Sequence, residues 1–195
     1  MKKKKIEIMD TTLRDGEQTS GMSFSEDEKL TISKLLLKEL KVYRIEVASA
    51  RVSSGEFKAV SKIIDWASSE NLENKVEILT FIDNGISIDW MKKSGAKVQN
   101  LLSKGSLNHL QHQLKKTPKE HFKDVDLAIR KAYKYNIKTN IYLEDWSNGM
   151  KDSKNYVIKF LNFLKNQPVN RILLPDTLGV LNPHETSQYL KEIIG

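Results

Sequence analysis

The chain has 195 residues, of which 39% are hydrophobic and 29% charged, which is enough to bury the core of one globular domain. No apolar run approaches the roughly 20 residues of a membrane span, and the lysines after Met1 lead into a strand-like pattern instead of a signal-peptide apolar region. We therefore expect a cytoplasmic protein without a membrane partner. Because the sequence has no cysteine, any metal must be held by oxygen or imidazole ligands.

The formal net charge is +7, and the four lysines at positions 2–5 contribute four of these charges. The remainder of the chain is only mildly basic, and no nucleic-acid-binding module accompanies the basic tail. The prediction is therefore no nucleic-acid partner. A modest positive field would also suit a phosphate-bearing cofactor.

Strand and helix patterns alternate along the chain. A short apolar run, Ile6–Met9, is expected to be a strand that delivers the chain into a charged loop at residues 10–18. A capping box at Ser25 and Glu28 then opens a helix. The remaining predicted elements are a strand at 44–48, a helix after Ser53, a strand at 76–81, a short helix at 89–93, a strand at 96–102, a helix opened by Pro118, a strand at 137–144, a helix over 156–164, a strand at 172–174 and a helix that begins after Asn182 and runs into Gly195.

This alternation predicts a parallel sheet, and the absence of a glycine-rich phosphate loop after the first strand disfavours a dinucleotide-binding fold. We expect an α/β fold, an incomplete (β/α)8 TIM barrel with about the first six βα units. Residues 1–195 would form one truncated catalytic domain without a regulatory domain. Its sheet would be open at the first and sixth strands, so the isolated chain is expected to aggregate.

The loop at residues 10–18 concentrates charged groups. Asp15 offers a hard oxygen ligand for Mg²⁺, Mn²⁺ or Zn²⁺, while Arg14 keeps its charge and can bind a carboxylate or a developing oxyanion in a forked geometry. Gly16 permits a tight backbone turn. A surface loop with an internal Arg–Asp pair explains the same residues equally well, so the loop alone does not decide between the two interpretations.

Polar residues follow five of the predicted strands, where a barrel gathers its chemistry. Period-two alternation places Tyr142 on one face with Glu144, Leu102 with Asn100, and Leu79 with Phe81. Leu79 and Leu102 would then help to wall a small pocket beside Tyr142. Ordinary barrel packing is the alternative explanation for these residues. The polar strand ends are Arg14 and Asp15, Glu46 with Ser49 and Arg51, Asn100 with Ser103 and Lys104, Glu144 and Asp145, and Asp176 and Thr177.

Five stretches resemble the catalytic barrel of the metal-dependent Claisen-condensing family that includes 2-isopropylmalate, homocitrate and citramalate synthases, with the related 3-hydroxy-3-methylglutaryl-CoA (HMG-CoA) lyases. The stretches are residues 10–18, 44–51, 100–106, 142–149 and 174–179. The resemblance implies acetyl-CoA as co-substrate, a 2-keto acid as acceptor and a divalent metal cofactor. It also implies a role in branched-chain amino-acid biosynthesis.

Carried over by position, the resemblance implies that Asp15 is a metal ligand and that Arg14 polarises the keto oxygen, with Gln18 nearby. It places Glu144 and Thr177 around the keto-acid carboxylate and the catalytic water. Arg14 and Glu144 are therefore the candidate catalytic residues. The side chains expected to line the substrate pocket resemble the bulkier ones of citramalate synthases. They favour pyruvate over 2-ketoisovalerate, because a pocket discriminates by roughly 1 to 3 kcal/mol per methylene-sized group. These wall residues are Leu79, Leu102 and Tyr142.

The sequence departs from the family in its histidines. The family completes its metal site with a His-x-His pair on the seventh strand, and none of the four histidines here stands in such a pair. His109 and His112 are three residues apart, so a helix would bring them onto one face as a substitute metal pair. A surface role is the favoured alternative for both. The expectation is an incomplete metal site and a poorly active isolated chain.

The leading hypothesis is the N-terminal part of a citramalate synthase. The alternatives are a 2-isopropylmalate synthase, a noncatalytic remnant, or one part of a split barrel. Expected partners are the small-molecule substrates, with a homodimer or a complementing C-terminal fragment as further possibilities.

Overall fold

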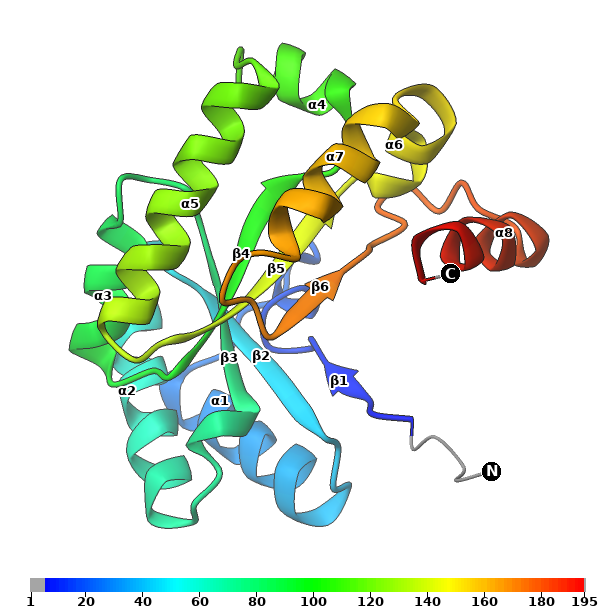
Figure 1. Cartoon of the computed structure of the whole chain (residues 1–195). Coiled ribbons are helices and arrows are strands. Elements are labelled where there is room, and N and C mark those ends of the chain that lie inside the picture. The colour runs from blue at the N-terminus through cyan, green and yellow to red at the C-terminus, as the bar shows by residue number, and fades with distance from the viewer. Residues whose placement is uncertain (1–5, 195) are drawn as a thin grey trace, which may run out of the picture. The chain divides into compact units, whose positions relative to one another are not determined.

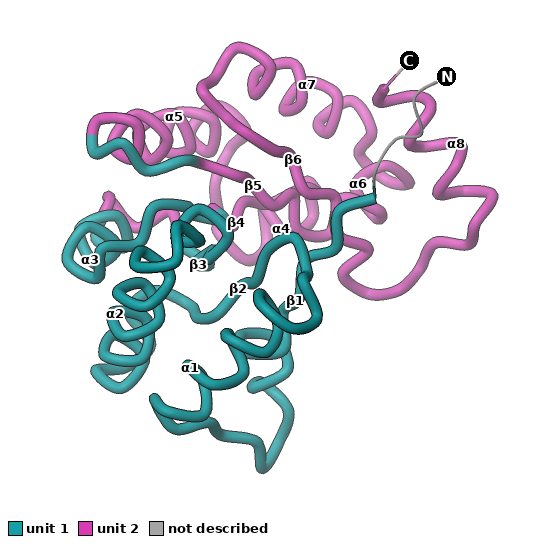
Figure 2. The backbone as a smooth tube through the Cα atoms, turned by 90° about the horizontal axis from the view of Figure 1, so that it is seen from below, with its two compact units in different colours: residues 1–81, 86–100, 135–138 teal, residues 82–85, 101–134, 139–195 magenta. Residues whose placement is uncertain are grey.

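The computed structural model describes residues 6–194, in which strands and helices alternate (Figure 1). The chain divides into two compact units (Figure 2). Unit 1 comprises residues 1–81, 86–100 and 135–138, and unit 2 comprises residues 82–85, 101–134 and 139–195. The strand order is β1-β2-β3-β4-β5-β6, the order expected for successive βα units. Strands β4 (Val98–Lys104) and β5 (Lys138–Glu144) run through both units.

Unit 1 begins with β1 (Met9–Asp10), which pairs in parallel with β2 (Arg44–Ser49). Strand β2 also pairs in parallel with β3 (Val76–Thr80), with an irregular register between Glu46 and Ala48. The 3-10 turns η1 (Gly16–Gln18) and η3 (Glu73–Lys75) precede α1 and β3, respectively. The other helical elements of this unit are α1 (Glu26–Lys34), the π-helical turn η2 (Leu35–Glu39), α2 (Ser54–Ser69) and α3 (Ile86–Ser94).

Local signals explain where the helices of unit 1 start. The Ser25 side chain accepts a hydrogen bond from the Glu28 amide, while the Glu28 carboxylate accepts one from the Ser25 amide, so the capping box predicted for α1 is present. Ser53 caps α2 in the same way through the Glu56 amide at 3.0 Å. Helix α2 buries one stripe at helical spacing, which packs it into the core of the unit. The stripe consists of Ala59, Val60, Ile63, Ile64 and Ala67.

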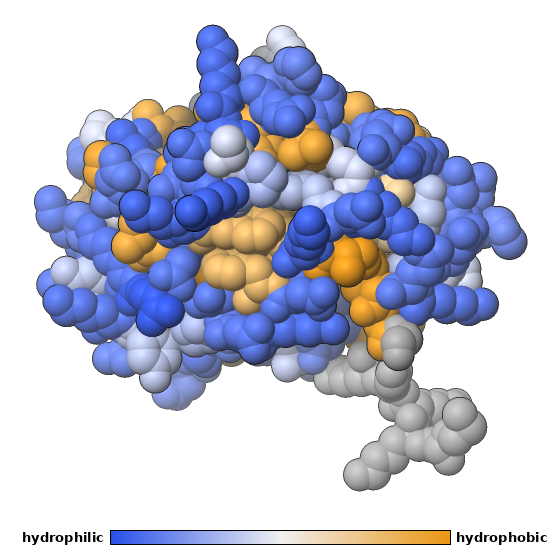
Figure 3. Space-filling model, turned by 45° about the horizontal axis from the view of Figure 1, so that its top comes forward, coloured by the Kyte–Doolittle hydropathy of each residue, from blue (hydrophilic) through white to orange (hydrophobic). Residues whose placement is uncertain are grey.

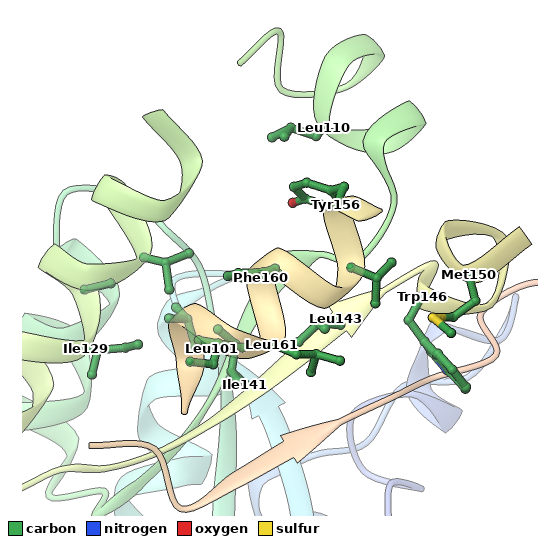
Figure 4. Close-up of a cluster of buried hydrophobic side chains, with 14 residues drawn as sticks. Leu101, Leu110, Ile129, Ile141, Leu143, Trp146, Met150, Tyr156, Phe160 and Leu161 are labelled. Atoms are coloured by element: carbon green, nitrogen blue, oxygen red, sulfur yellow. The ribbon is translucent and has the colours of Figure 1, made fainter. Parts of the chain in front are cut away.

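Unit 2 contains most of β5, which pairs in parallel with β6 (Arg171–Leu173). Its core lies between α7 (Lys154–Leu164) and the strands, where Phe160 and Leu161 of α7 meet Leu101, Ile141 and Leu143 (Figure 4). The other helices of this unit are α4 (Leu107–His112), α5 (Pro118–Lys134), α6 (Trp146–Asp152) and α8 (Pro183–Ile194).

Several predicted boundaries were wrong. Strand β1 contains only Met9 and Asp10, although the Ile8 carbonyl accepts hydrogen bonds from the amides of Tyr43 and Arg44. Strand β4 runs to Lys104, two residues past the predicted end. The short helix expected at 89–93 covers Ile86–Ser94, and α6 had not been predicted. The expected end of the last helix at Gly195 lies outside the described residues.

The face in Figure 3 is mostly hydrophilic, with apolar patches between the polar side chains. Within residues 6–194, no helix combines the length and apolar character needed to cross a membrane.

Candidate active site

The loop after β1 is held by its own backbone. The carbonyl of Thr11 accepts hydrogen bonds from the amides of Arg14, Asp15 and Gly16 at 3.1, 2.7 and 3.2 Å. The amide and hydroxyl of Thr12 both donate to the Asp10 carboxylate. These contacts close a tight turn, so Arg14 and Asp15 leave the backbone from a defined position at the end of β1.

Arg14 lies between two carboxylates of unit 1. Its Nε donates to Glu46 Oε2 at 2.5 Å and its Nη1 donates to Asp15 Oδ1 at 2.7 Å. Glu46 is fully buried in β2 and also accepts a hydrogen bond from Asn100 Nδ2 at 2.6 Å. A charge-assisted pair with a buried partner fixes the guanidinium far more firmly than a surface pair does. The Arg14–Asp15 pair of the surface-loop interpretation is present, and the Asp15 side chain is 60% exposed, but Arg14 is also paired with the buried Glu46, which that interpretation does not include.

A cavity of about 320 Å³ opens beside this loop, and Arg14 and Gln18 both line it. Leu79 is buried in β3 and is not among the lining residues of this cavity. The structure thus brings three predicted site residues of unit 1 together, namely Arg14, Asp15 and Gln18. The cavity is lined by Leu13, Arg14, Glu17, Gln18, Ala48, Ser49, Val52, Ser53 and Glu56.

The predicted residues of unit 2 follow the strand alternation. Ile141 and Leu143 are buried in the hydrophobic core, whereas Tyr142 and Glu144 alternate with them and remain partly exposed. Leu102 of β4 is likewise partly exposed next to the buried Leu101. The predicted pairing of Tyr142 with Glu144 on one strand face is therefore confirmed.

Glu144 is held by both its side chain and its backbone. Its carboxylate forms an ion pair with Lys104, and its carbonyl accepts a hydrogen bond from the Gly105 amide at 2.6 Å. A Cβ at Gly105 would lie 2.5 Å from the Leu143 carbonyl oxygen, so only glycine allows this close approach of the two strand ends. The hydroxyl of Tyr156 donates to the Lys104 carbonyl at 2.8 Å, and burial raises the pKa of this Tyr156 hydroxyl.

Asp145 connects Glu144 to Thr177. It is buried with a φ of 64°, and its carboxylate accepts hydrogen bonds from Ser106 Oγ at 2.6 Å and Asn148 Nδ2 at 2.7 Å. Its amide donates to Thr177 Oγ1 at 2.9 Å. Downstream, the amide of Leu181 donates to the Asp176 carboxylate at 2.9 Å and lowers the pKa of Asp176. The structure therefore brings Glu144 and Thr177 into one hydrogen-bonded region of unit 2.

The described residues do not fit a metal ion. Within residues 6–194, no three His, Cys, Asp or Glu side chains converge as a metal-binding group, and Asp15 is engaged by Arg14. His109 and His112 both lie on α4, where His112 is exposed and His109 Nε2 is 3.4 Å from Asp145 Oδ2. A substitute histidine pair does not form, and the surface role expected for His109 is wrong because its side chain is only 17% exposed.

The sequence does not identify Glu46, Asn100, Lys104 and Asp145 as members of the site. Each is a polar residue at the end of a predicted strand, and the sequence assigns it no partner. Glu46 carried a stronger signal, since an ionised carboxylate within the apolar stretch 45–48 requires a buried cationic or hydrogen-bonding partner. The partner itself could not be read from the sequence, because Arg14 lies 32 positions away.

The model of the HMGL-like family matches residues 5–195. The chain belongs to the HMGL-like family. It is 31% identical over 191 residues to a probable 2-isopropylmalate synthase from Ignicoccus hospitalis, covering 98% of this chain and 46% of that protein. It is 32% identical over 189 residues to an (R)-citramalate synthase from Methanocaldococcus jannaschii, covering 96% of this chain and 36% of that protein. This HMGL-like chain thus spans less than half the length of these two relatives.

Solved structures support the predicted fold. A hydroxymethylglutaryl-CoA lyase from Pseudomonas aeruginosa superposes with a TM-score of 0.72 at 17% identity, covering 97% of this chain and 63% of the lyase. An HMG-CoA lyase in complex with coenzyme A and 3-methylmalate gives a TM-score of 0.64 at 17% identity, covering 96% of this chain and 62% of the lyase. The incomplete TIM-barrel fold predicted for this HMGL-like chain is confirmed.

Proposed function

We propose that this chain carries the keto-acid-binding part of a citramalate-type synthase, which condenses acetyl-CoA with pyruvate. The observation that carries the proposal is the pairing of Arg14 with the buried Glu46, because it presents a fixed guanidinium at the rim of a cavity. Residues 1–195 would then be a portion of the catalytic barrel domain.

In the proposed reaction, a base removes a proton from the acetyl-CoA methyl group and the resulting carbanion attacks the keto carbon of pyruvate. The keto oxygen becomes an alkoxide, which takes up a proton to give a hydroxyl group, and water then cleaves the thioester to a carboxylate and free CoA. Arg14 is suited to the alkoxide because its guanidinium is already oriented and stays charged throughout. Glu144, ion-paired with Lys104, is suited to orienting the water, and Thr177 to binding the keto-acid carboxylate.

The proposal also specifies which keto acid is the substrate. Leu102 and Tyr142 are bulky, partly exposed side chains on the strands that carry Lys104 and Glu144. Side chains of this size favour the methyl group of pyruvate over the isopropyl group of 2-ketoisovalerate. The second candidate function, a 2-isopropylmalate synthase, is supported by the similarity to the Ignicoccus hospitalis protein.

The proposed activity needs groups beyond the described residues, because Asp15 alone does not make a metal site. We therefore propose that the chain acts as part of a longer protein, or together with a complementing C-terminal fragment or a second copy. A cytoplasmic location is part of the same proposal. A noncatalytic remnant is the rival proposal, and the assay below distinguishes it.

The test follows the release of CoA with a reagent that reacts with thiols. This chain gives no background signal because it contains no cysteine. The chain is assayed with acetyl-CoA, Mn²⁺ and either keto acid, alone and after addition of a C-terminal barrel fragment that supplies a His-x-His pair. We expect pyruvate-dependent release only in the complemented sample, and at least a hundredfold loss with Arg14→Lys. Faster release with 2-ketoisovalerate would favour the second candidate, and no release in any sample would favour the remnant.

A further inference from the structure

Lys29 is a lysine of α1 whose side chain is only 1% exposed. Its Nζ forms ion pairs with Glu17 Oε2, at 2.5 Å, and with Glu56 Oε1 of α2. It also lies 3.4 Å from the carbonyl oxygen of Leu13, to which it donates a hydrogen bond. A buried ammonium is costly to desolvate, so a site that satisfies it with three oxygens is built around it.

Two of the three oxygens come from residues of the loop after β1. Leu13 and Glu17 stand on either side of the segment 14–16, which carries Arg14 and Asp15. The amides of this segment all converge on the Thr11 carbonyl, and Glu17 is further held because its Oε1 accepts from the Phe24 amide at 2.9 Å. One ammonium therefore holds both ends of the segment.

Packing of α1 against α2 is the simpler explanation for a buried lysine at this place. It accounts for the contact with Glu56, since that residue belongs to α2. It does not account for the contacts with Leu13 and Glu17, because both of these lie in the loop after β1. Two of the three oxygens around the ammonium thus belong to the loop.

We propose that Lys29 is a positioning residue for the loop 13–17 and holds Arg14 in place for the keto acid. The proposal rests on the proposed function for the role of Arg14, whereas the anchoring of the loop stands on the contacts of Lys29 alone. Without the ammonium, the carboxylates of Glu17 and Glu56 would face each other uncompensated and push the loop away from α2.

The test replaces Lys29 with methionine, which keeps the apolar stem and removes the ammonium. Hydrogen exchange of the amides at 14–16 and the NMR resonance of the Arg14 Nε–H are measured without keto acid. The resonance is assigned to Arg14 by its disappearance in the Arg14→Lys variant. We expect at least tenfold faster exchange and a shifted resonance in Lys29→Met. Lys38→Met is the matched control, because it breaks an exposed ion pair with Glu70 and should change neither signal.

Unchanged exchange at 14–16, or an equal rise at Val60 and Ile63 in the core of unit 1, would overturn the proposal. If Lys29→Met does not fold, Glu17→Gln decides, because it keeps an oxygen for the Phe24 amide and removes the charge that faces Lys29. We then expect at least threefold faster exchange at 14–16, and no change would contradict the anchor. If exchange at 14–16 rises in Lys29→Met while the chain fails the CoA-release assay, the proposed function is rejected and the role of Lys29 in holding the loop stands.

Discussion

The end of β1 and the end of β5 present their functional groups by different physical means. In unit 1, Arg14 projects from a loop and is held mainly through side-chain charge, by Glu46 in β2. In unit 2, Glu144 is itself the last residue of β5, and backbone hydrogen bonds from Gly105 and to Thr177 hold its surroundings. The comparison teaches that backbone hydrogen bonds can close a loop, as those to the Thr11 carbonyl do here, whereas a buried ion pair fixes the direction of a long side chain that leaves it.

The largest effect is expected when the buried charge pair of unit 1 is broken. Arg14→Met leaves the Glu46 carboxylate buried with its hydrogen bond from Asn100 but without the charge of Arg14, so the free energy of unfolding should fall by about 3 kcal/mol. Urea denaturation followed by circular dichroism measures this loss. Arg130→Met is the control, since it breaks an exposed pair with Asp126 and should cost far less stability than Arg14→Met. Equal losses in both variants would contradict a special role for the buried ion pair of unit 1.

A backbone change should break unit 2. In Gly105→Ala, the new Cβ meets the Leu143 carbonyl oxygen at 2.5 Å and its carbon at 2.8 Å, so the ends of β4 and β5 must separate. We expect the free energy of unfolding to fall by about 2 kcal/mol. Gly55→Ala in α2 is the matched control, because a Cβ there would lie 3.6 Å from Ser53 Oγ, an ordinary van der Waals contact. That variant should be neutral or more stable by up to about 1 kcal/mol, and a similar loss in the two variants would refute the steric explanation.

Acid should destabilise unit 2, which contains all four histidines of the chain. Burial lowers the pKa of His121 to about 4, and its ring packs edge-on against Phe160 with centroids 5.2 Å apart. The unfolded chain binds a proton near pH 6.5 and the folded chain only near pH 4. Stability from the neutral ring is therefore present above pH 6.5 and is lost as the pH falls toward 4.

Wild type should lose about 2 kcal/mol more than His121→Phe between pH 7 and pH 5, measured by urea denaturation at each pH. His184→Gln, at an exposed position, is the control and should retain the wild-type pH dependence. The same acid sensitivity in wild type and His121→Phe would rule out His121 as its source.

The smallest effect is expected for the ion pair of unit 2. The side chain of Glu144 is 25% exposed, so Lys104→Met leaves a carboxylate that water can reach. The loss in the free energy of unfolding should be about 1 kcal/mol or less, smaller than for Arg14→Met. Thermal denaturation of the two variants side by side measures the difference. A larger loss for Lys104→Met would reverse the comparison between the two strand ends.

Much of the fold could be predicted because its signals are local. The caps at Ser25 and Ser53 and the proline at position 118 placed the starts of three long helices correctly. Helix α6 was missed because it is seven residues long and contains Gly149, so it has too few turns to show a helical period. The end of β4 was placed too early because Ser103 and Lys104 look like loop residues, although the strand continues through them.

The sequence by itself determined the alternation of strands and helices, the family and the presence of charged groups at the strand ends, because these depend on neighbouring residues and their order. Only the tertiary structure decided which charges meet. Arg14 pairs with Glu46, Lys29 with Glu17 and Glu56, and Lys104 with Glu144. Partners 12 to 40 positions apart become neighbours only when the chain folds, since a buried charge takes the partner that packing brings to it.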